Sequence, residues 1–190
     1  MRHPMPVLFL SLLVLSTLSG CAAVAVTGAA TGVLMVDDRR TSATFVMDEE
    51  IELKAGNRLR ESALEAVNAS FTSYNRKLLI TGQAPSAAAK AQVSDIARGT
   101  ANVRDVINEM SIGGPSGFST HSDDAYITSK VKARFIDDKQ FHANRVKVVT
   151  ESGVVYLMGL VTQAEGKQAA DLAASTSGVK RVVKVFEYID

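Results

Sequence analysis

The sequence predicts an α+β protein of two tandem domains, each with the order helix, strand, strand, helix, strand. Three observations support this prediction. The chain repeats itself at an offset of 76 or 77 residues, each copy holds an apolar run that turns back on itself, and each copy has apolar residues at helical spacing. We therefore expect each domain to form a small mixed three-stranded sheet packed on two helices.

The internal repeat sets the number of folding units. An offset of 76 aligns the first helix of each copy and places Ile51, Lys54, Arg58 and Leu59 over Ile127, Lys130, Arg134 and Phe135. An offset of 77 aligns the strand after the hairpin turn, and the offset of 76 returns for the second helix and last strand. These alignments predict a first domain over residues 47–112, a linker over 113–121 and a second domain over 122–190.

The first helix of the second domain has one apolar stripe. Ile127, Val131 and Phe135 recur every four residues, which is typical of the buried face of an amphipathic helix. Asp123 and Asp124 favour the start of this helix, because carboxylates are stabilised near a helix N-terminus.

A β-hairpin follows in each domain. Residues 146–150 alternate in hydrophobicity, 151–153 form a tight turn, and 154–158 return as a strand. The first domain has Asn75 in the turn where the second has Gly153, and both residue types tolerate positive φ.

The second helix of each domain is rich in alanine. In the second domain we expect it over 163–177, with Gly178 placed to end it and a final strand over 179–189. The side chains expected to face inward are Ala169, Leu172 and Ala173.

The N-terminus has the form of a bacterial lipoprotein signal. Leu18-Ser19-Gly20-Cys21 follows the apolar stretch 7–18 and ends in the chain's only cysteine. We expect residues 1–20 to be a signal peptide, and Cys21 to carry acyl chains such as palmitate on its sulfur and amine. The alternatives are a buried free cysteine or an uncleaved anchor helix through 7–36, which its glycines disfavour.

We expect residues 21–46 to form a lipidated, flexible tether near the membrane surface. Its Ala22 favours sorting to the outer membrane, because an aspartate here commonly retains such lipoproteins at the inner membrane.

Composition argues against several functions. Without residues 1–20 the chain has 20 basic and 20 acidic side chains, so it is not a general nucleic-acid binder. His121 and His142 lack the neighbouring ligands of a metal site, and no nucleophile lies near a base. We expect no enzymatic activity, no cofactor and no metal.

The most specific motifs lie after the hairpin and before the last strand. Gly159-Leu160-Val161-Thr162 and Gly178-Val179-Lys180-Arg181-Val182 resemble the BON domain. Two such units behind a lipobox resemble the dual BON-domain outer-membrane lipoproteins of the DolP type over essentially the whole chain.

That resemblance implies a non-enzymatic protein on the periplasmic face of the outer membrane. It implies binding of anionic phospholipid, such as phosphatidylglycerol or cardiolipin, through the second domain, and support of envelope integrity. It also implies association with the β-barrel assembly machinery and with septal peptidoglycan remodelling.

Comparison of the two repeats also favours the second domain as the lipid-binding one. A second stripe lies beside the buried one and is formed by Tyr126, Lys130 and Arg134, which are four residues apart. An aromatic ring with two cations suits a membrane interface, because the ring enters the headgroup layer and the cations meet lipid phosphate. The matching positions of the first domain hold Glu50, Lys54 and Arg58. Because carboxylates surround Glu50, we expect lipid binding by the second domain only. The alternative is an ordinary solvated helix face.

The linker contains Phe118, an apolar residue out of character with its glycines. Phe118 either covers an inter-domain contact or enters the membrane beside Tyr126. The alternative function is a protein-interaction adaptor, in which the acidic first domain and exposed strand edges dock onto an assembly factor or peptidoglycan enzyme.

Overall fold

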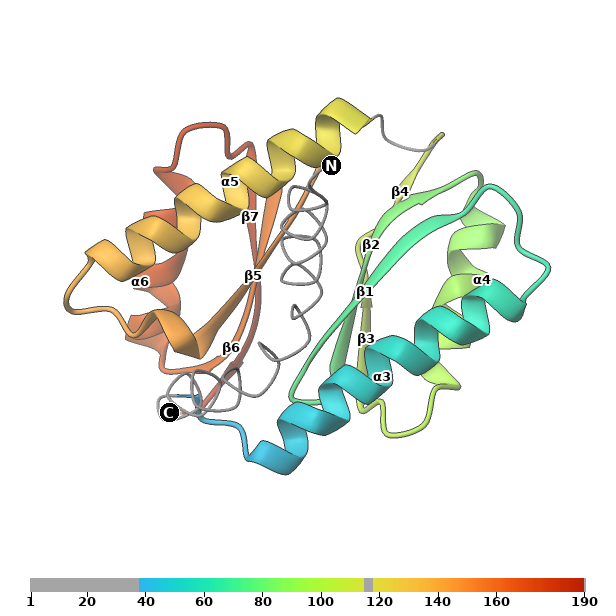
Figure 1. Ribbon diagram of the computed structural model, residues 1–190, viewed down its shortest axis with the longest axis horizontal. Helices are drawn as coiled ribbons and strands as arrows, with labels where there is room; N and C mark the ends of the chain where they lie inside the picture. Colours follow the sequence, from blue (N-terminus) through green and yellow to red (C-terminus); the bar gives the residue numbers. More distant parts are fainter. Residues whose placement is uncertain (1–37, 115–117, 190) are drawn as a thin grey trace, which may run out of the picture. The chain divides into compact units, whose positions relative to one another are not determined.

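A computed structural model describes residues 38–114 and 118–189 (Figure 1). The first half contains α3 (Ser42–Glu61), β1 (Asn68–Tyr74), β2 (Lys77–Ala84), α4 (Ala87–Arg98), β3 (Asp105–Asn108) and β4 (Ser111–Ile112). The second half contains α5 (Phe118–Asp137), the 3-10 helix η3 (Ala143–Arg145), β5 (Val146–Glu151), β6 (Val154–Val161), α6 (Gln163–Ala174) and β7 (Arg181–Tyr188). The predicted α+β class and element order are confirmed, and β4 is an addition.

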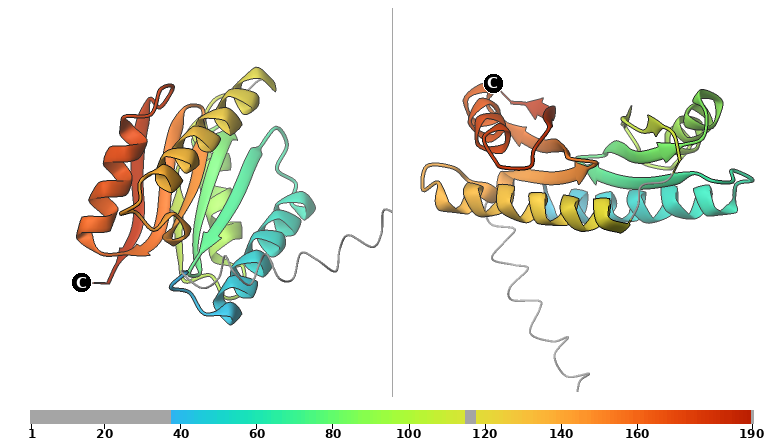
Figure 2. Two further views of the ribbon diagram at one scale, coloured as in Figure 1. Left: turned by 60° about the vertical axis from the view of Figure 1, so that its left-hand side comes forward. Right: turned by 90° about the horizontal axis from the view of Figure 1, so that it is seen from above.

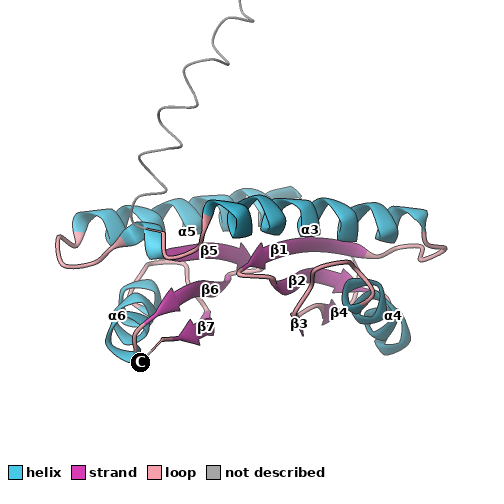
Figure 3. Cartoon of the chain, turned by 90° about the horizontal axis from the view of Figure 1, so that it is seen from below, coloured by secondary structure: helices cyan, strands magenta, loops and turns pink. Residues whose placement is uncertain are grey.

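Each sheet is mixed, as predicted. The antiparallel hairpins are β1–β2 and β5–β6, and the last strands β3 and β7 run parallel to β2 and β6. The short β4 continues the parallel pairing with β2 beyond β3. Figure 3 shows α3 along β1 and α5 along β5, with α4 and α6 beside the later strands.

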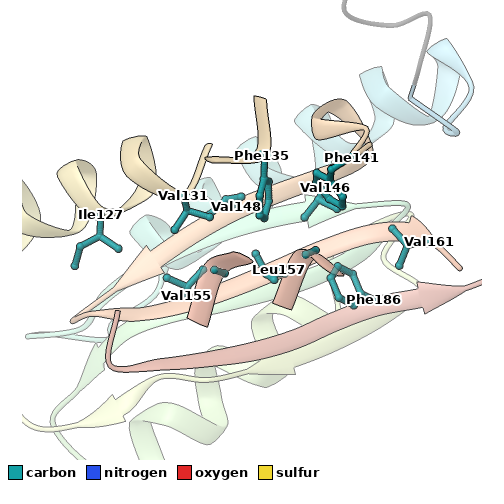
Figure 4. Packing of buried hydrophobic residues seen from close by; sticks show 12 residues of the cluster. Ile127, Val131, Phe135, Phe141, Val146, Val148, Val155, Leu157, Val161 and Phe186 are labelled. Atoms are coloured by element: carbon teal, nitrogen blue, oxygen red, sulfur yellow. The ribbon is translucent and has the colours of Figure 1, made fainter. Parts of the chain in front are cut away.

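Side chains alternate along each central strand between two buried environments. In β6, Val155 and Leu157 face the core shared with α5 and α6, which Figure 4 shows from close by. Ala169 and Ala173 are fully buried in this core and Leu172 packs against it, as predicted. The equivalent core of the first half is formed by side chains of α3, α4 and β2.

The other faces of the two sheets share a third buried cluster. It contains Tyr74 and Leu79 of the first half and Tyr156, Met158 and Val185 of the second, all at most 5% exposed. The central strands β2 and β6 of the two sheets (Figure 2) are therefore buried on both faces. This explains the nearly continuous apolar run of β6.

Ion pairs and hydrogen bonds surround this inter-domain cluster. Lys147 Nζ lies 2.8 Å from Glu52 Oε1, and Gln83 Nε2 donates to Glu151 Oε1 over 2.6 Å. The Arg104 guanidinium pairs with Glu187.

Both hairpin turns have two residues with positive φ. The angles are 51° and 65° at Asn75 and Arg76, and 54° and 80° at Ser152 and Gly153. Positive φ at both positions is the requirement of a type I′ turn, whose twist matches the flanking strands. Gly153 thus corresponds to Arg76, and Asn75 to Ser152, which corrects the predicted match.

A buried aspartate on the preceding helix holds each turn. Asp124 accepts hydrogen bonds from the backbone N–H groups of Ser152 (2.6 Å) and Gly153 (2.7 Å). Asp48 does the same for Asn75 (2.8 Å) and Arg76 (2.7 Å). Asp124 therefore lies inside α5 and holds the hairpin turn. The prediction that it marks the start of the helix is wrong.

Part of the predicted tether lies within the described structure. Helix α3 begins at Ser42, where the Thr41 side chain accepts from the Thr44 N–H, and Arg40 pairs with the buried Asp48 at 2.9 Å. The flexible tether predicted over 21–46 is therefore wrong for residues 38–46. The signal peptide 1–20, Cys21 and the tether up to residue 37 lie outside the described residues.

Two further boundaries differ from the prediction. Phe118 is the first residue of α5, so the predicted linker 113–121 overlaps the helix. Helix α6 ends at Ala174, three residues before the predicted end at 177. Gly178, which has a φ of 96°, therefore lies in the loop before β7 and does not end the helix.

Within residues 38–114 and 118–189, no helix has the length and hydrophobicity needed to cross a membrane.

Candidate membrane-binding surface on helix α5

Helix α5 has a buried face and an outward face of different chemistry. Ile127, Val131 and Phe135 are at most 6% exposed and point from α5 to the sheet (Figure 4). The other side presents Tyr126, 65% exposed, and Ile136, 71% exposed. The exposed positions 129 and 133 between them hold a serine and an alanine, so the centre of this face is uncharged.

The structure brings Tyr126, Lys130 and Arg134 together as predicted. Lys130 Nζ lies 4.6 Å from the centre of the Tyr126 ring, a cation–π arrangement, and also donates to the Ser177 carbonyl. Arg134 Nη1 donates to Thr176 Oγ1 over 3.4 Å. Both cations thus lie along the flank of α5 that faces the loop between α6 and β7.

The sequence reasoning missed Ile136 and Lys132. Ile136 follows the buried Phe135 directly, and Lys132 is exposed on the flank of α5 away from Lys130. Lys132 and Ile136 border a groove of about 410 Å³ that Phe45 of α3 also lines. The sequence did contain a signal for Ile136, because this isoleucine does not belong to the buried stripe of residues four apart. A large apolar residue on the polar face of a helix is a candidate contact residue.

The structure does not place Phe118 on this surface. The backbone of Phe118 begins α5, but its side chain is not among those that the structure describes. The choice between an inter-domain contact and a membrane contact for Phe118 stays a prediction.

The matching surface of α3 is internally paired. Lys54 Nζ lies 2.6 Å from Glu50 Oε1, and the Arg58 guanidinium donates to the Gly99 carbonyl. Asp48 and Glu52 are paired with Arg40 and Lys147. These ion pairs offset part of the negative charge at the start of α3, where Glu49 is also exposed. That this helix start disfavours an anionic surface stays a prediction.

No metal-binding chemistry accompanies this surface. Among the side chains that the structure describes, no three of His, Cys, Asp or Glu are grouped to hold a metal ion. His121 and His142 are both exposed.

Comparison with known families agrees with the two-domain architecture. The BON domain model matches residues 47–114 and again 123–190. The chain belongs to the BON-domain family. Its two BON domains coincide with the two α+β halves, so the family and the fold agree.

Several known proteins match most of this chain in sequence. The chain is 38% identical over 177 residues to "Outer membrane lipoprotein DolP" of Haemophilus influenzae, covering 91% of each chain. It is 33% identical to the "21 kDa hemolysin" of Actinobacillus pleuropneumoniae, covering 80% of this chain and 79% of that one. It is 27% identical to "Osmotically-inducible protein Y" of Escherichia coli, covering 68% and 73%. The chain is thus a dual BON-domain protein of the DolP type.

Proposed function

We propose that this chain is a non-enzymatic, lipid-anchored protein of the periplasmic face of the outer membrane, where it binds anionic phospholipid through α5 and supports membrane integrity. The relative named outer membrane lipoprotein supports the location. In this proposal residues 1–20 are removed, Cys21 is acylated, and residues 22–37 link the anchor to the folded part.

The observation that carries the lipid-binding role is the pairing of Tyr126 with Lys130 on a helix face that ends in Ile136. Aromatic rings prefer the headgroup layer, and cations beside them meet lipid phosphate. Lys130, Lys132 and Arg134 flank the uncharged centre of the face, which lets the helix lie parallel to the bilayer surface.

The energies favour weak, tether-assisted binding. Each cation near an anionic surface contributes about 1 kcal/mol, and full burial of an isoleucine contributes about 1.5–3 kcal/mol. The acyl anchor raises the effective concentration of α5 at the bilayer, so modest contacts decide where the protein accumulates.

Vesicle co-sedimentation tests this proposal. The chain from residue 21 onward, carrying Cys21→Ser, is mixed with phosphatidylglycerol or cardiolipin vesicles. Tyr126→Ala and Lys130→Glu should each weaken binding, whereas Leu53→Ala, at a similarly exposed apolar position of α3, should not. Unchanged binding in both α5 variants would contradict the assigned surface.

A second function is favoured by α3. Val46 and Leu53 are 65% and 62% exposed and lie seven residues apart on its outward face. Such a stripe suits docking of a protein partner, for example a component of the β-barrel assembly machinery or a septal peptidoglycan enzyme. Crosslinking in membranes through the first domain should then recover a stoichiometric partner even when Tyr126 is replaced.

A further inference from the structure

A groove is lined by helix α3 of the first domain and by helix α5 of the second. It has a volume of about 410 Å³, within the roughly 300–1,000 Å³ of ligand-binding pockets. Helix α3 lines it with Phe45 and Glu49, and helix α5 lines it with Lys132 and Ile136. Residues four apart lie on one face of a helix, so each helix presents one apolar and one charged side chain to the groove.

The apolar part of the groove is open to a partner at one edge. Tyr74 and Phe135 also line the groove and are buried, whereas Ile136 is 71% exposed. An exposed isoleucine beside aromatic side chains is a surface that another molecule can cover with a gain in buried apolar area.

Most of the charged side chains that line the groove are already paired. Arg40 lies 2.6 Å from a carboxylate oxygen of Asp38 and 2.9 Å from one of Asp48. Lys147 lies 2.8 Å from Glu52. These groups therefore give the groove little net charge with which to attract a ligand.

Glu49 and Lys132 are different. Both are exposed, and neither side chain takes part in an ion pair or hydrogen bond within the part of the chain that the structure describes. The groove thus presents one unpaired carboxylate from α3 and one unpaired ammonium from α5. A strongly acidic or strongly basic partner would meet one matched charge and one like charge here, which disfavours it.

This pattern is complementary to itself. When two identical chains meet about a two-fold axis, each contact between one residue and another occurs twice, with the roles of the copies exchanged. Lys132 of each copy can then meet Glu49 of the other. Two equal ion pairs would flank the apolar side chains, and no like charges would be brought together.

We propose that this groove pairs two copies of the chain about a two-fold axis. Ile136 of each copy enters the groove of the other beside Phe45, and Lys132 and Glu49 form the two flanking ion pairs. The proposed function assigns Ile136 and Lys132 to the bilayer, so pairing and membrane binding compete for α5. This inference goes beyond the proposed function, because it requires no lipid.

Sedimentation velocity of the Cys21→Ser chain from residue 21 onward, in the absence of lipid, tests the pairing. This chain should show a concentration-dependent equilibrium between monomer and dimer. Lys132→Glu and Glu49→Lys should each raise the Kd of the dimer more than about tenfold, because each brings like charges together at two places. Lys139→Glu and Glu61→Lys make the same reversals at exposed positions outside the groove and should leave the Kd unchanged.

Mixing the two charge-reversal variants gives the sharpest result. In a mixed pair both contacts again join a positive to a negative charge. An equimolar mixture of Lys132→Glu and Glu49→Lys should therefore dimerise at a concentration where each variant alone is monomeric. Native mass spectrometry with one variant isotope-labelled identifies the mixed dimer. A substitution that merely damaged the fold would not be rescued by mixing.

The outcomes are separate from those of the vesicle test. A chain with the native groove that stays monomeric at all concentrations would overturn the pairing and leave the groove to the bilayer or to a different protein. A mixture that forms no more dimer than either variant alone would also overturn it. Growth beyond a dimer would contradict the two-fold arrangement, because a two-fold contact closes on itself. Since these measurements contain no lipid, their failure leaves the proposed membrane binding intact.

Discussion

The ammonium of Lys130 lies 4.6 Å from the centre of the Tyr126 ring, whereas the matching lysine of α3, Lys54, lies 2.6 Å from the carboxylate of Glu50. One substitution between the two repeats thus changes the environment of an equivalent cation. On α5 the positive charge stays available above an aromatic ring. On α3 it is neutralised within the helix.

This difference predicts a gain of function in α3. Replacing Glu50 by Tyr should release Lys54, remove a negative charge and add a ring, so binding to anionic vesicles should strengthen about fivefold, as for one added surface cation. Glu61→Tyr, at the end of the same helix, is the matched control. If both variants bind vesicles equally, the pairing of residues 50 and 54 does not explain the difference between the domains.

The aspartate beneath the β5–β6 turn should contribute to stability. Asp124→Ala leaves the backbone N–H groups of Ser152 and Gly153 without their acceptor, and we expect the free energy of unfolding to fall by about 1–3 kcal/mol. Asp123→Ala, one residue away and exposed, should change it by less than about 0.5 kcal/mol. Urea unfolding of both variants measures the difference, and similar losses would argue against the tethering role.

The cluster between the two sheets should make the BON domains unfold together. Met158 is fully buried there and faces the other domain rather than its own helices. Met158→Asp should place an unpaired charge in this cluster and split one calorimetric transition into two. Lys184→Asp, exposed on the neighbouring β7, should preserve the single transition. A single transition in the Met158 variant would show that the domains are coupled by other contacts.

The carboxylate of Glu165 should make stability depend on pH. Burial disfavours its charged form, but hydrogen bonds from Arg39, the Thr162 backbone and Arg145 outweigh this and lower its pKa from 4.5 to about 2. A lowered pKa stabilises the folded protein above about pH 4.5, and this contribution disappears as the pH falls towards 2.

Glu165→Gln should therefore flatten the pH dependence of the free energy of unfolding in this window. Urea unfolding at several pH values measures it, with Asp171→Asn, an exposed carboxylate of α6, as the control. An unchanged profile in the Glu165 variant would contradict the lowered pKa. The same carboxylate holds Arg39, which precedes α3, because Arg39 Nη1 lies 2.6 Å from Glu165 Oε2.

The sequence predicted the elements well because their signals are local. The four-residue recurrence of Ile127, Val131 and Phe135 depends only on helix geometry, and the two-domain organisation follows from the repeat. The packing of one sheet against the other was not predicted. Tyr156 and Met158 alternate with core residues in β6, and periodicity shows that both faces are buried without showing what covers the second face.

The candidate surface was predicted in part. The spacing of Tyr126, Lys130 and Arg134 placed them on one stripe, but the exposure of Ile136 depends on how α5 rotates against its sheet. The surroundings of Tyr126 and Lys130 depend on contacts between residues far apart in the chain, such as Lys130 with the Ser177 carbonyl. Such contacts leave no periodic pattern in a single sequence.

The depth of spin labels on α5 and α3 tests the central claim most directly. Because Cys21 is the only cysteine, the Cys21→Ser chain accepts one label at Ile136→Cys or at Leu53→Cys, two positions that are 71% and 62% exposed in the native protein. With phosphatidylglycerol vesicles, the label at 136 should become more accessible to oxygen and less accessible to a water-soluble nickel complex, while the label at 53 stays in water. A label at 136 that remains as accessible to nickel as the label at 53 would contradict membrane binding through α5.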